Sequence, residues 1–200
     1  MSSNIAIIGK GFGWWNHQKH IFDEVWGIND IFRFTKCDRI FDMHDFEWTY
    51  EDCLKHYKCV APDAVKDEIE NRAAVKFKYS VIKARDINKY KIPLYSIREY
   101  EHIPSSVEYP RESVLAEVCH NVELLQGTLA YAIAYAIFAE FKSINLFGCT
   151  LDPASEWAYQ IPSVAFLYGI AVERGLDWYM DKCSGIVDST FKYGYIESYA

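Results

Sequence analysis

The chain begins with an apolar run, Ile5-Ala6-Ile7-Ile8, that leads directly into the glycine-rich turn Gly9-Lys10-Gly11-Phe12-Gly13. An apolar strand that ends in such a turn is typical of nucleotide-binding α/β folds. Glycines let the backbone come close to a phosphate, and the helix that follows directs its free N–H groups toward the same point. This feature predicts an α/β fold and a phosphate-bearing ligand, and it specifies no reaction.

Size and composition favour one domain with a substantial core. The 200 residues are 50% hydrophobic, the net charge is −7, and the six cysteines include no CxxC pair. The acidic balance argues against a protein dedicated to binding duplex nucleic acid, and the scattered cysteines are interpreted as reduced thiols. No signal peptide and no run of apolar residues long enough for a bilayer are evident, so we expect a cytoplasmic protein without a membrane partner.

Six short apolar segments have the pattern of β-strands: 5–8, 24–29, 39–43, 92–95, 143–147 and 176–180. Proline lacks a backbone donor, so Pro93 favours an edge position for the fourth of them. Helical periodicity is strongest over 127–141 and 162–174, and each of these segments directly precedes a predicted strand. The alternation predicts a Rossmann-like, mostly parallel sheet with helices on both faces.

Two stretches lack this alternation. Residues 49–90 are rich in Lys, Glu and Asp, which predicts one or two helices or a lid-like insertion. Residues 99–114 contain Pro104 and Pro110 and are expected to form a loop. We therefore expect a single Rossmann-like nucleotide-binding domain over 1–200, with an insertion at about 49–90.

The glycine turn is not a complete dinucleotide fingerprint. Gly9, Gly11 and Gly13 are present, but Trp14 occupies the third glycine position of G-x-G-x-x-G, which argues against standard NAD or FAD binding. The turn also lacks the GK[ST] ending of a P-loop. The alternatives are a phosphate- or ribose-binding loop and a purely structural turn. Trp14 itself either stacks on a base or packs under the sheet.

Further candidate nucleotide-binding residues follow the second predicted strand and precede the strongest helix. Asn29 and Asp30 stand at a strand end, where they either bind a sugar hydroxyl or base edge or cap the next helix. Gln126, Gly127 and Thr128 precede the helix at 127–141. We expect Thr128 to cap that helix, and the same group also suits contact with a phosphate.

Candidate catalytic residues follow two other predicted strands. His44 lies among three carboxylates in 42–48, a set of residue types suited to a general base, a metal site or a solvated loop. The spacing matches no metal motif, and we predict no metal. Gly148 and Thr150 end another strand, and the polar–aromatic loop that follows supplies three further candidates, Asp152, Glu156 and Tyr159.

In their order along the chain, several short motifs resemble one Rossmann-like superfamily. They are the strand-Gly-x-Gly start, Val25-Trp26-Gly27-Ile28-Asn29-Asp30, Cys37-Asp38-Arg39-Ile40-Phe41-Asp42-Met43-His44, Gly127-Thr128, and Ile144-Asn145-Leu146-Phe147-Gly148. The superfamily holds the CMP-sialic-acid sialyltransferases of the Campylobacter type, archaeal hydroxymethylpterin pyrophosphokinase-like proteins and uncharacterised phage proteins. A phage origin would place the chain in the host cytoplasm.

The resemblance assigns roles to individual positions. Gly9 and Gly11 match the first nucleotide loop, Asn29 matches an asparagine that contacts the nucleotide sugar, and Gly127-Thr128 match a small-residue loop. Gly148 matches the glycine of a terminal Gly-x-Asp, although the aspartate position is Thr150 here.

The catalytic histidine of such sialyltransferases has no counterpart in 151–162. Asp152, Glu156 or His44 would therefore have to act as the base, and Tyr159 could bind a leaving phosphate. The resemblance implies a metal-independent, glycosyltransferase-like enzyme that takes a nucleotide or nucleotide sugar and needs no cofactor. The alternatives are a non-catalytic protein that sequesters a nucleotide and a pyrophosphokinase-like phosphotransferase. The sequence leaves open whether the chain forms a homo-oligomer.

Overall fold

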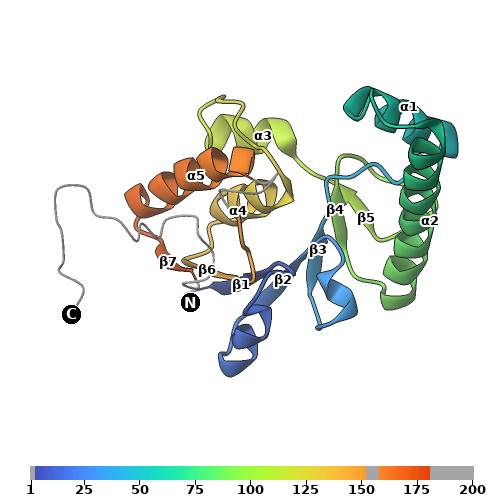
Figure 1. The fold of residues 1–200 in the computed structure, drawn as a ribbon. Coiled ribbons are helices and arrows are strands. Elements are labelled where there is room, and N and C mark those ends of the chain that lie inside the picture. Colours follow the sequence, from blue (N-terminus) through green and yellow to red (C-terminus); the bar gives the residue numbers. More distant parts are fainter. Residues whose placement is uncertain (1–2, 152–157, 181–200) are drawn as a thin grey trace, which may run out of the picture. The chain divides into compact units, whose positions relative to one another are not determined.

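The computed structural model describes residues 3–151 and 158–180, which fall into two compact units. Unit 1 comprises the described residues up to Cys37 and from Pro110 onward, and unit 2 comprises Asp38–Tyr109. Each unit contains both helices and strands that pair in parallel (Figure 1). The predicted α/β class with a parallel sheet is confirmed.

Unit 1 contains four strands, in the order β2-β1-β6-β7: β1 (Asn4–Ile8), β2 (Glu24–Ile28), β6 (Ser143–Phe147) and β7 (Asp177–Met180). All three pairings are parallel, and Ile7 of β1 stands opposite Trp26 of β2 and Leu146 of β6. β2 lies on one side of β1, and β6, which comes later in the chain, lies on the other side of β1, so the strand order reverses between β1 and β6. In Rossmann-like folds, ligands bind beyond the carboxyl ends of the strands at such a reversal.

Helices cover both faces of the unit 1 strands, as predicted. The α-helices are α3 (Arg111–Glu117), α4 (Thr128–Phe138) and α5 (Ile161–Glu173), and the 3-10 helices are η1 (Trp14–Lys19), η2 (Ile31–Arg33) and η3 (Ala158–Gln160). On one face, the Trp26 ring lies 5.7 Å from that of Tyr135 in α4. On the opposite face, the Phe147 ring lies 6.4 Å from that of His17 in η1. Figure 1 shows α4 and η1 on opposite sides of these strands.

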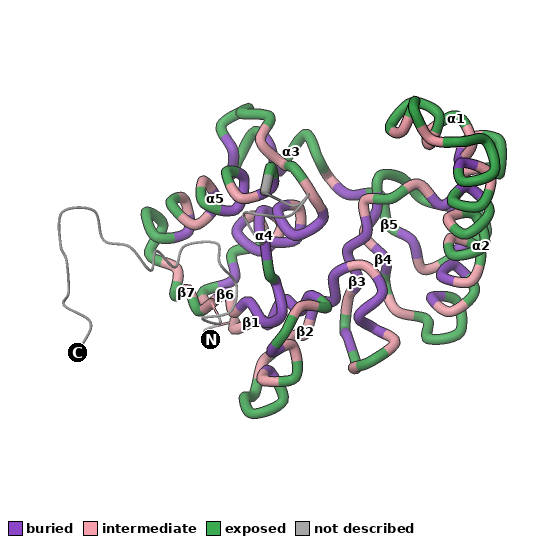
Figure 2. The backbone as a smooth tube through the Cα atoms, in the orientation of Figure 1, coloured by how far each residue is buried: buried purple, intermediate pink, exposed green. Residues whose placement is uncertain are grey.

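Burial on both faces explains the apolar run at the start of the chain. Ile5, Ala6, Ile7 and Ile8 are each fully buried, and the strand is drawn almost wholly in the buried colour in Figure 2. A strand covered on both faces carries a continuous apolar sequence, whereas a half-exposed strand alternates.

Helix ends also follow the sequence: Pro162 lies in the first turn of α5, and Gly175 adopts a positive φ of 72° beyond its end.

Unit 2 contains three parallel strands, in the order β5-β4-β3: β3 (Arg39–Phe41), β4 (Leu94–Ser96) and β5 (Ser106–Glu108). The edge position predicted for the strand around Pro93 is therefore wrong, because β4 pairs on both sides. Pro93 lies just before β4, so its missing N–H removes no donor from the strand itself. The three-residue β5 occupies part of the segment that was predicted to be a loop.

Two helices fill the segment for which one or two helices or an insertion were predicted. They are α1 (Tyr50–Val60) and α2 (Lys66–Tyr90). A capping box begins α1: the Thr49 hydroxyl accepts from the Asp52 N–H at 3.2 Å, and the Asp52 carboxylate accepts from the Thr49 N–H at 3.0 Å. Whether this segment is an insertion into one domain stays a prediction.

Candidate functional site

The loops that follow β1 and β6 lie directly against each other in unit 1. The Gly9 N–H donates to the Phe147 carbonyl at 2.9 Å, and the Gly11 N–H donates to the Gly148 carbonyl at 2.7 Å. An added Cβ would lie 2.5 Å from the Gly148 oxygen at Gly9, and 1.9 Å from Thr150 Oγ1 at Gly11. Gly9 and Gly11 therefore have a packing reason to be glycine, and their amide protons join the two loops.

Three other amides of this turn have no backbone acceptor among the described residues. Within residues 3–151 and 158–180, no backbone carbonyl accepts from the N–H of Lys10, Phe12 or Gly13. Gly13 adopts a φ of 86° where η1 begins, a conformation that favours glycine. Phosphate binding by the predicted turn thus stays a prediction for these three positions.

The end of β2 meets the start of α4. Thr128 Oγ1 lies 3.3 Å from Asn29 Oδ1, to which it donates a hydrogen bond across 99 positions of sequence. Thr128 is the first residue of α4 and Gly127, with a φ of 89°, is the N-cap. The expectation that Thr128 caps the helix is therefore wrong, because its hydroxyl bonds to Asn29 instead.

Two residues at the start of α5, Gln160 and Ser163, contact the loop before α4. Neither was predicted from the sequence as a site residue. The Gln126 N–H donates to Ser163 Oγ at 3.2 Å. The amide of Gln160, a buried residue, lies so close to Gly127 that an added Cβ would be 2.1 Å from its Oε1. Neither residue carries a sequence motif, so only their position identifies them.

Lys10 adds a cation to this edge. Its Nζ lies 2.7 Å from Asp30 Oδ1, while the Arg33 guanidinium lies 3.8 Å from the other carboxylate oxygen. The Lys10 side chain is 51% exposed and that of Asp30 is 8% exposed. Asp30 precedes η2, but its side chain makes no capping hydrogen bond there, so the predicted alternative of a helix cap is not realised. Lys10 belongs to the glycine motif, but the pattern did not identify it as a candidate.

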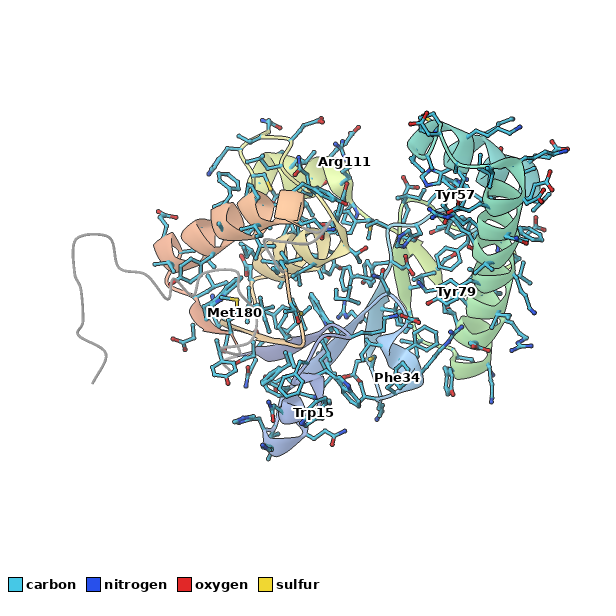
Figure 3. The ribbon with its side chains drawn as sticks, in the orientation of Figure 1. Trp15, Phe34, Tyr57, Tyr79, Arg111 and Met180 are labelled. Atoms are coloured by element: carbon cyan, nitrogen blue, oxygen red, sulfur yellow. The ribbon has the colours of Figure 1, made fainter. Side chains whose placement is uncertain are left out.

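Aromatic rings gather beside the glycine turn. The rings of Phe12 and Trp15 meet edge to face at 5.1 Å, and both side chains are exposed. Trp14 lies 5.9 Å from Trp15 and 6.3 Å from Phe34, and it stacks on His17 at 6.1 Å. Figure 3 labels Trp15 on η1 and Phe34 just beyond η2. Trp14 is engaged with protein rings on several sides, which leaves Phe12 and Trp15 as the more open surfaces for stacking a base.

Cys149 lies at the same edge but is unsuited to nucleophilic chemistry. Its Sγ donates to the carbonyls of Ile7 and Phe147 at 3.6 and 3.5 Å. Burial raises the pKa of the Cys149 thiol to about 12, so almost no thiolate is present near neutrality.

Unit 2 contains the other chemically distinctive group, the pair Asp42 and His44. Asp42 is fully buried and its Oδ1 lies 2.6 Å from His44 Nδ1. Burial alone would raise the pKa of Asp42, but the Lys83 ammonium and the hydrogen bond from His44 outweigh it, so the pKa lies below its usual value. The neighbouring Asp45 pairs with Arg98 at 2.5 Å.

The predicted site residues thus divide between the two units. Unit 1 brings together the ends of β1, β2 and β6 and the start of α4, which include every predicted nucleotide-binding residue. His44 belongs to unit 2. Tyr159 is 58% exposed and accepts a hydrogen bond from Gln160 Nε2 at 3.3 Å. Asp152 and Glu156 lie outside the described residues.

An open cavity of about 560 Å³ in unit 2 contains none of the predicted residues. Its lining comes from the end of α2 and the segment before β5: Asn88, Lys91, Glu101, His102, Pro104 and Ser105. The carboxyl ends of parallel strands are the usual ligand edge, whereas this cavity is formed by residues that precede β4 and β5.

Over the described parts of the chain, no three His, Cys, Asp or Glu side chains are grouped so that they could hold a metal ion. None of the helices in those parts is both long and apolar enough to cross a bilayer.

The chain matches no protein-family model, no curated protein and no solved structure.

Proposed function

We propose that unit 1 binds a nucleotide or nucleotide sugar at the edge formed by the ends of β1, β2 and β6 and the start of α4. The observation that carries the proposal is the docking of the Gly9–Gly13 turn on the loop after β6, at the point where the strand order reverses between β1 and β6. Ligands of open α/β sheets bind at such reversals. The ligand class follows from the donors and cations at that edge.

Each part of a nucleotide has a suitable partner there. Phosphate oxygens suit the amides of Lys10, Phe12 and Gly13, together with the Lys10 ammonium. The N-terminus of α4 adds a second set of donors with a favourable helix dipole. Asn29, held by Thr128, presents an amide suited to a ribose hydroxyl. The exposed rings of Phe12 and Trp15 suit a stacked base.

We further propose that the bound nucleotide is the leaving group of a metal-independent, glycosyltransferase-like reaction. In such a reaction an acceptor oxygen forms the new glycosidic bond, and the nucleotide departs with the electrons of the broken one. Fixed donors at the phosphate stabilise the charge that develops on it. Tyr159, an exposed residue whose hydroxyl accepts from Gln160 Nε2 and keeps its own proton to donate, is the proposed donor to the leaving phosphate.

Binding is tested by thermal unfolding with a panel of nucleoside mono- and diphosphates and nucleotide sugars. A ligand at 100 times its Kd stabilises the native chain by about 2.7 kcal/mol, which raises the Tm of a chain this long by roughly 5–11 °C. Failure of every compound in the panel at millimolar concentration would refute nucleotide binding.

The site is tested with Lys10→Met. Its loss removes the ammonium 2.7 Å from the buried Asp30 carboxylate, so some loss of stability is expected, and binding is measured as the ligand-induced rise above each variant's own Tm. That rise is expected to be smaller in Lys10→Met than in the unmodified chain. Lys19→Met is the matched control, since Lys19 is an exposed lysine of the same segment whose Nζ bonds to Asn16 at 3.1 Å. An equal loss of ligand response in both variants would mean that general charge, and not this edge, binds the ligand.

Turnover separates the proposed reaction from its alternatives. Release of free nucleotide from a nucleotide sugar in EDTA supports metal-independent glycosyl transfer. A nucleotide that binds tightly and is recovered unchanged supports a sequestering protein. Strict dependence on ATP and Mg²⁺ supports a pyrophosphokinase-like phosphotransferase.

A further inference from the structure

Unit 2 holds an exposed imidazole on a buried carboxylate. Asp42, the residue after β3, accepts the backbone N–H of His44 at 3.1 Å and contacts its ring Nδ1 at 2.6 Å. The Asp42 side chain is fully buried, whereas that of His44 is 63% exposed. An ionised carboxylate can only accept hydrogen bonds, so this contact places the ring proton on Nδ1. The free lone pair is then on Nε2, on an imidazole open to solvent.

Lys83 keeps the carboxylate charged. Its ammonium reaches Asp42 Oδ2 from α2, and its side chain is only 5% exposed. The same ammonium lies 5.7 Å from the ring centroids of Phe46 and Tyr79, which surround it with apolar and aromatic surface. Removing either charge would leave the other buried without compensation. Asp42 therefore remains an anion, and it is as an anion that it orients His44.

Other charged groups near His44 are already paired. Asp45 lies 2.5 Å from Arg98, which also reaches Glu47 at 3.3 Å. The Tyr100 hydroxyl lies 3.4 Å from the backbone carbonyl of His44, not from its ring. Asp42 is thus the carboxylate that controls the imidazole, with Lys83 behind it.

We propose that His44 is a general base whose Nε2 accepts the proton of a hydroxyl-bearing substrate or of water, and that Asp42 is its positioning residue. As the oxygen forms its bond to an electrophilic centre, its proton moves to Nε2 and the leaving group departs with the electrons of the broken bond. Asp42 stabilises the imidazolium, which returns the proton to the leaving group or to solvent. The inference concerns unit 2 and stands independently of nucleotide binding by unit 1.

Two features separate this role from a structural one. A histidine kept for packing would bury its ring, whereas this ring is mostly exposed. The pair also follows a parallel strand at its carboxyl end, where α/β folds place reacting groups.

The first test is the tautomer of neutral His44 in the unmodified chain, measured by long-range ¹H–¹⁵N NMR correlation above neutral pH. The proton is expected on Nδ1. A proton found on Nε2 would overturn the proposal, because that nitrogen could not then act as the base. This measurement needs no variant and so does not depend on any variant folding.

The second test is reaction with diethyl pyrocarbonate, followed at each histidine by mass spectrometry. The imidazole nitrogen forms a bond to a carbonyl carbon, ethyl carbonate leaves with the electron pair, and the ring loses a proton to solvent. His44 is expected to react at least as fast as His102 and His120, two exposed histidines of the same chain. Lack of reaction at His44 while these two are modified would overturn the proposal.

A double variant tests the positioning role of Asp42. Asp42→Leu with Lys83→Met removes both buried charges together, which avoids an unpaired ion. The fraction of neutral His44 with its proton on Nδ1 is expected to fall at least several-fold, since no acceptor then holds that proton. Glu68→Gln with Arg72→Met is the control, because it removes an exposed ion pair from the same helix. An unchanged tautomer in the first double variant, or an equal change in the control, would overturn the role of Asp42.

Discussion

Replacing Gly9 by alanine tests the contact on which the unit 1 site depends. Gly9 does not adopt a positive φ, so alanine is compatible with its backbone, and any cost comes from the added methyl group. That Cβ would lie 2.5 Å from the Gly148 oxygen and 3.3 Å from the Cα of Cys149. Both atoms belong to backbone, which cannot rotate away as a side chain can. The Gly148 oxygen is also held at 2.7 Å by the Gly11 N–H.

Relief of this overlap requires the two loops to separate by several tenths of an ångström. Overpacking of this kind costs about 1–3 kcal/mol. For a chain of this length, such a loss lowers the Tm by roughly 2–12 °C. Nucleotide binding is expected to weaken as well, because the displaced turn carries the donors proposed for the phosphate.

The assay is urea unfolding at equilibrium, with Gly169→Ala as the matched control. Gly169 lies within α5, and an added Cβ there would meet nothing within 4 Å. Alanine is favoured over glycine in a helix interior, so the control is expected to gain up to about 1 kcal/mol. If Gly9→Ala matched the wild type to within about 0.5 kcal/mol, the packing explanation for this glycine would be refuted.

Three other predictions concern side-chain chemistry. At pH 8, iodoacetamide is expected to modify the exposed Cys59 and to leave Cys149 unmodified until the chain unfolds. The reason is that a thiol with a pKa of about 12 is only about 10⁻⁴ ionised at this pH. Peptide mapping that found both cysteines modified in the native chain would contradict this. The pKa of Asp42 is lower in the folded chain than in the unfolded chain, where it lies near 4, so the ionised carboxylate stabilises the fold above about pH 4. This stabilisation is expected to be lost as the pH falls through the lower, folded-state pKa. Acid unfolding of the double variant Asp42→Leu with Lys83→Met should lack this loss. For a hydroxyl-bearing substrate that reacts at unit 2, His44→Gln is expected to lower kcat by about 10²–10⁴-fold, whereas His102→Gln leaves it unchanged; a loss under tenfold for His44 would argue against its role.

Local sequence signals predicted most of the elements of unit 1. The run at 5–8 is apolar because β1 is covered on both faces, and this leaves a clear pattern. The helix at 127–141 and the proline and glycine that bound α5 follow from helical periodicity and backbone preference. The signal was weaker in unit 2. The strand β5 is three residues long with two exposed positions, and pairing with β4 supplies what its own sequence does not.

The candidate site likewise contains residues that local sequence identifies and partners that only the folded structure identifies. Glycine motifs and polar residues at strand ends can be recognised one segment at a time, and parallel topology implies that these ends share an edge. The individual partners cannot be recognised in this way. Thr128 bonds to Asn29 across 99 positions, and this contact removed the cap that the local sequence favoured.

The histidine shows the distinction most clearly. Its residue type and its place after a strand marked His44 as a candidate base, because imidazole is the side chain that exchanges protons near neutrality. Which of its nitrogens carries the proton depends on a buried aspartate two residues earlier and on a lysine of α2 that keeps this aspartate charged. Residue order supplies the chemical groups and their local conformations, whereas burial and long-range contact, which arise only when the helix packs on the strands, set the charge and orientation of those groups.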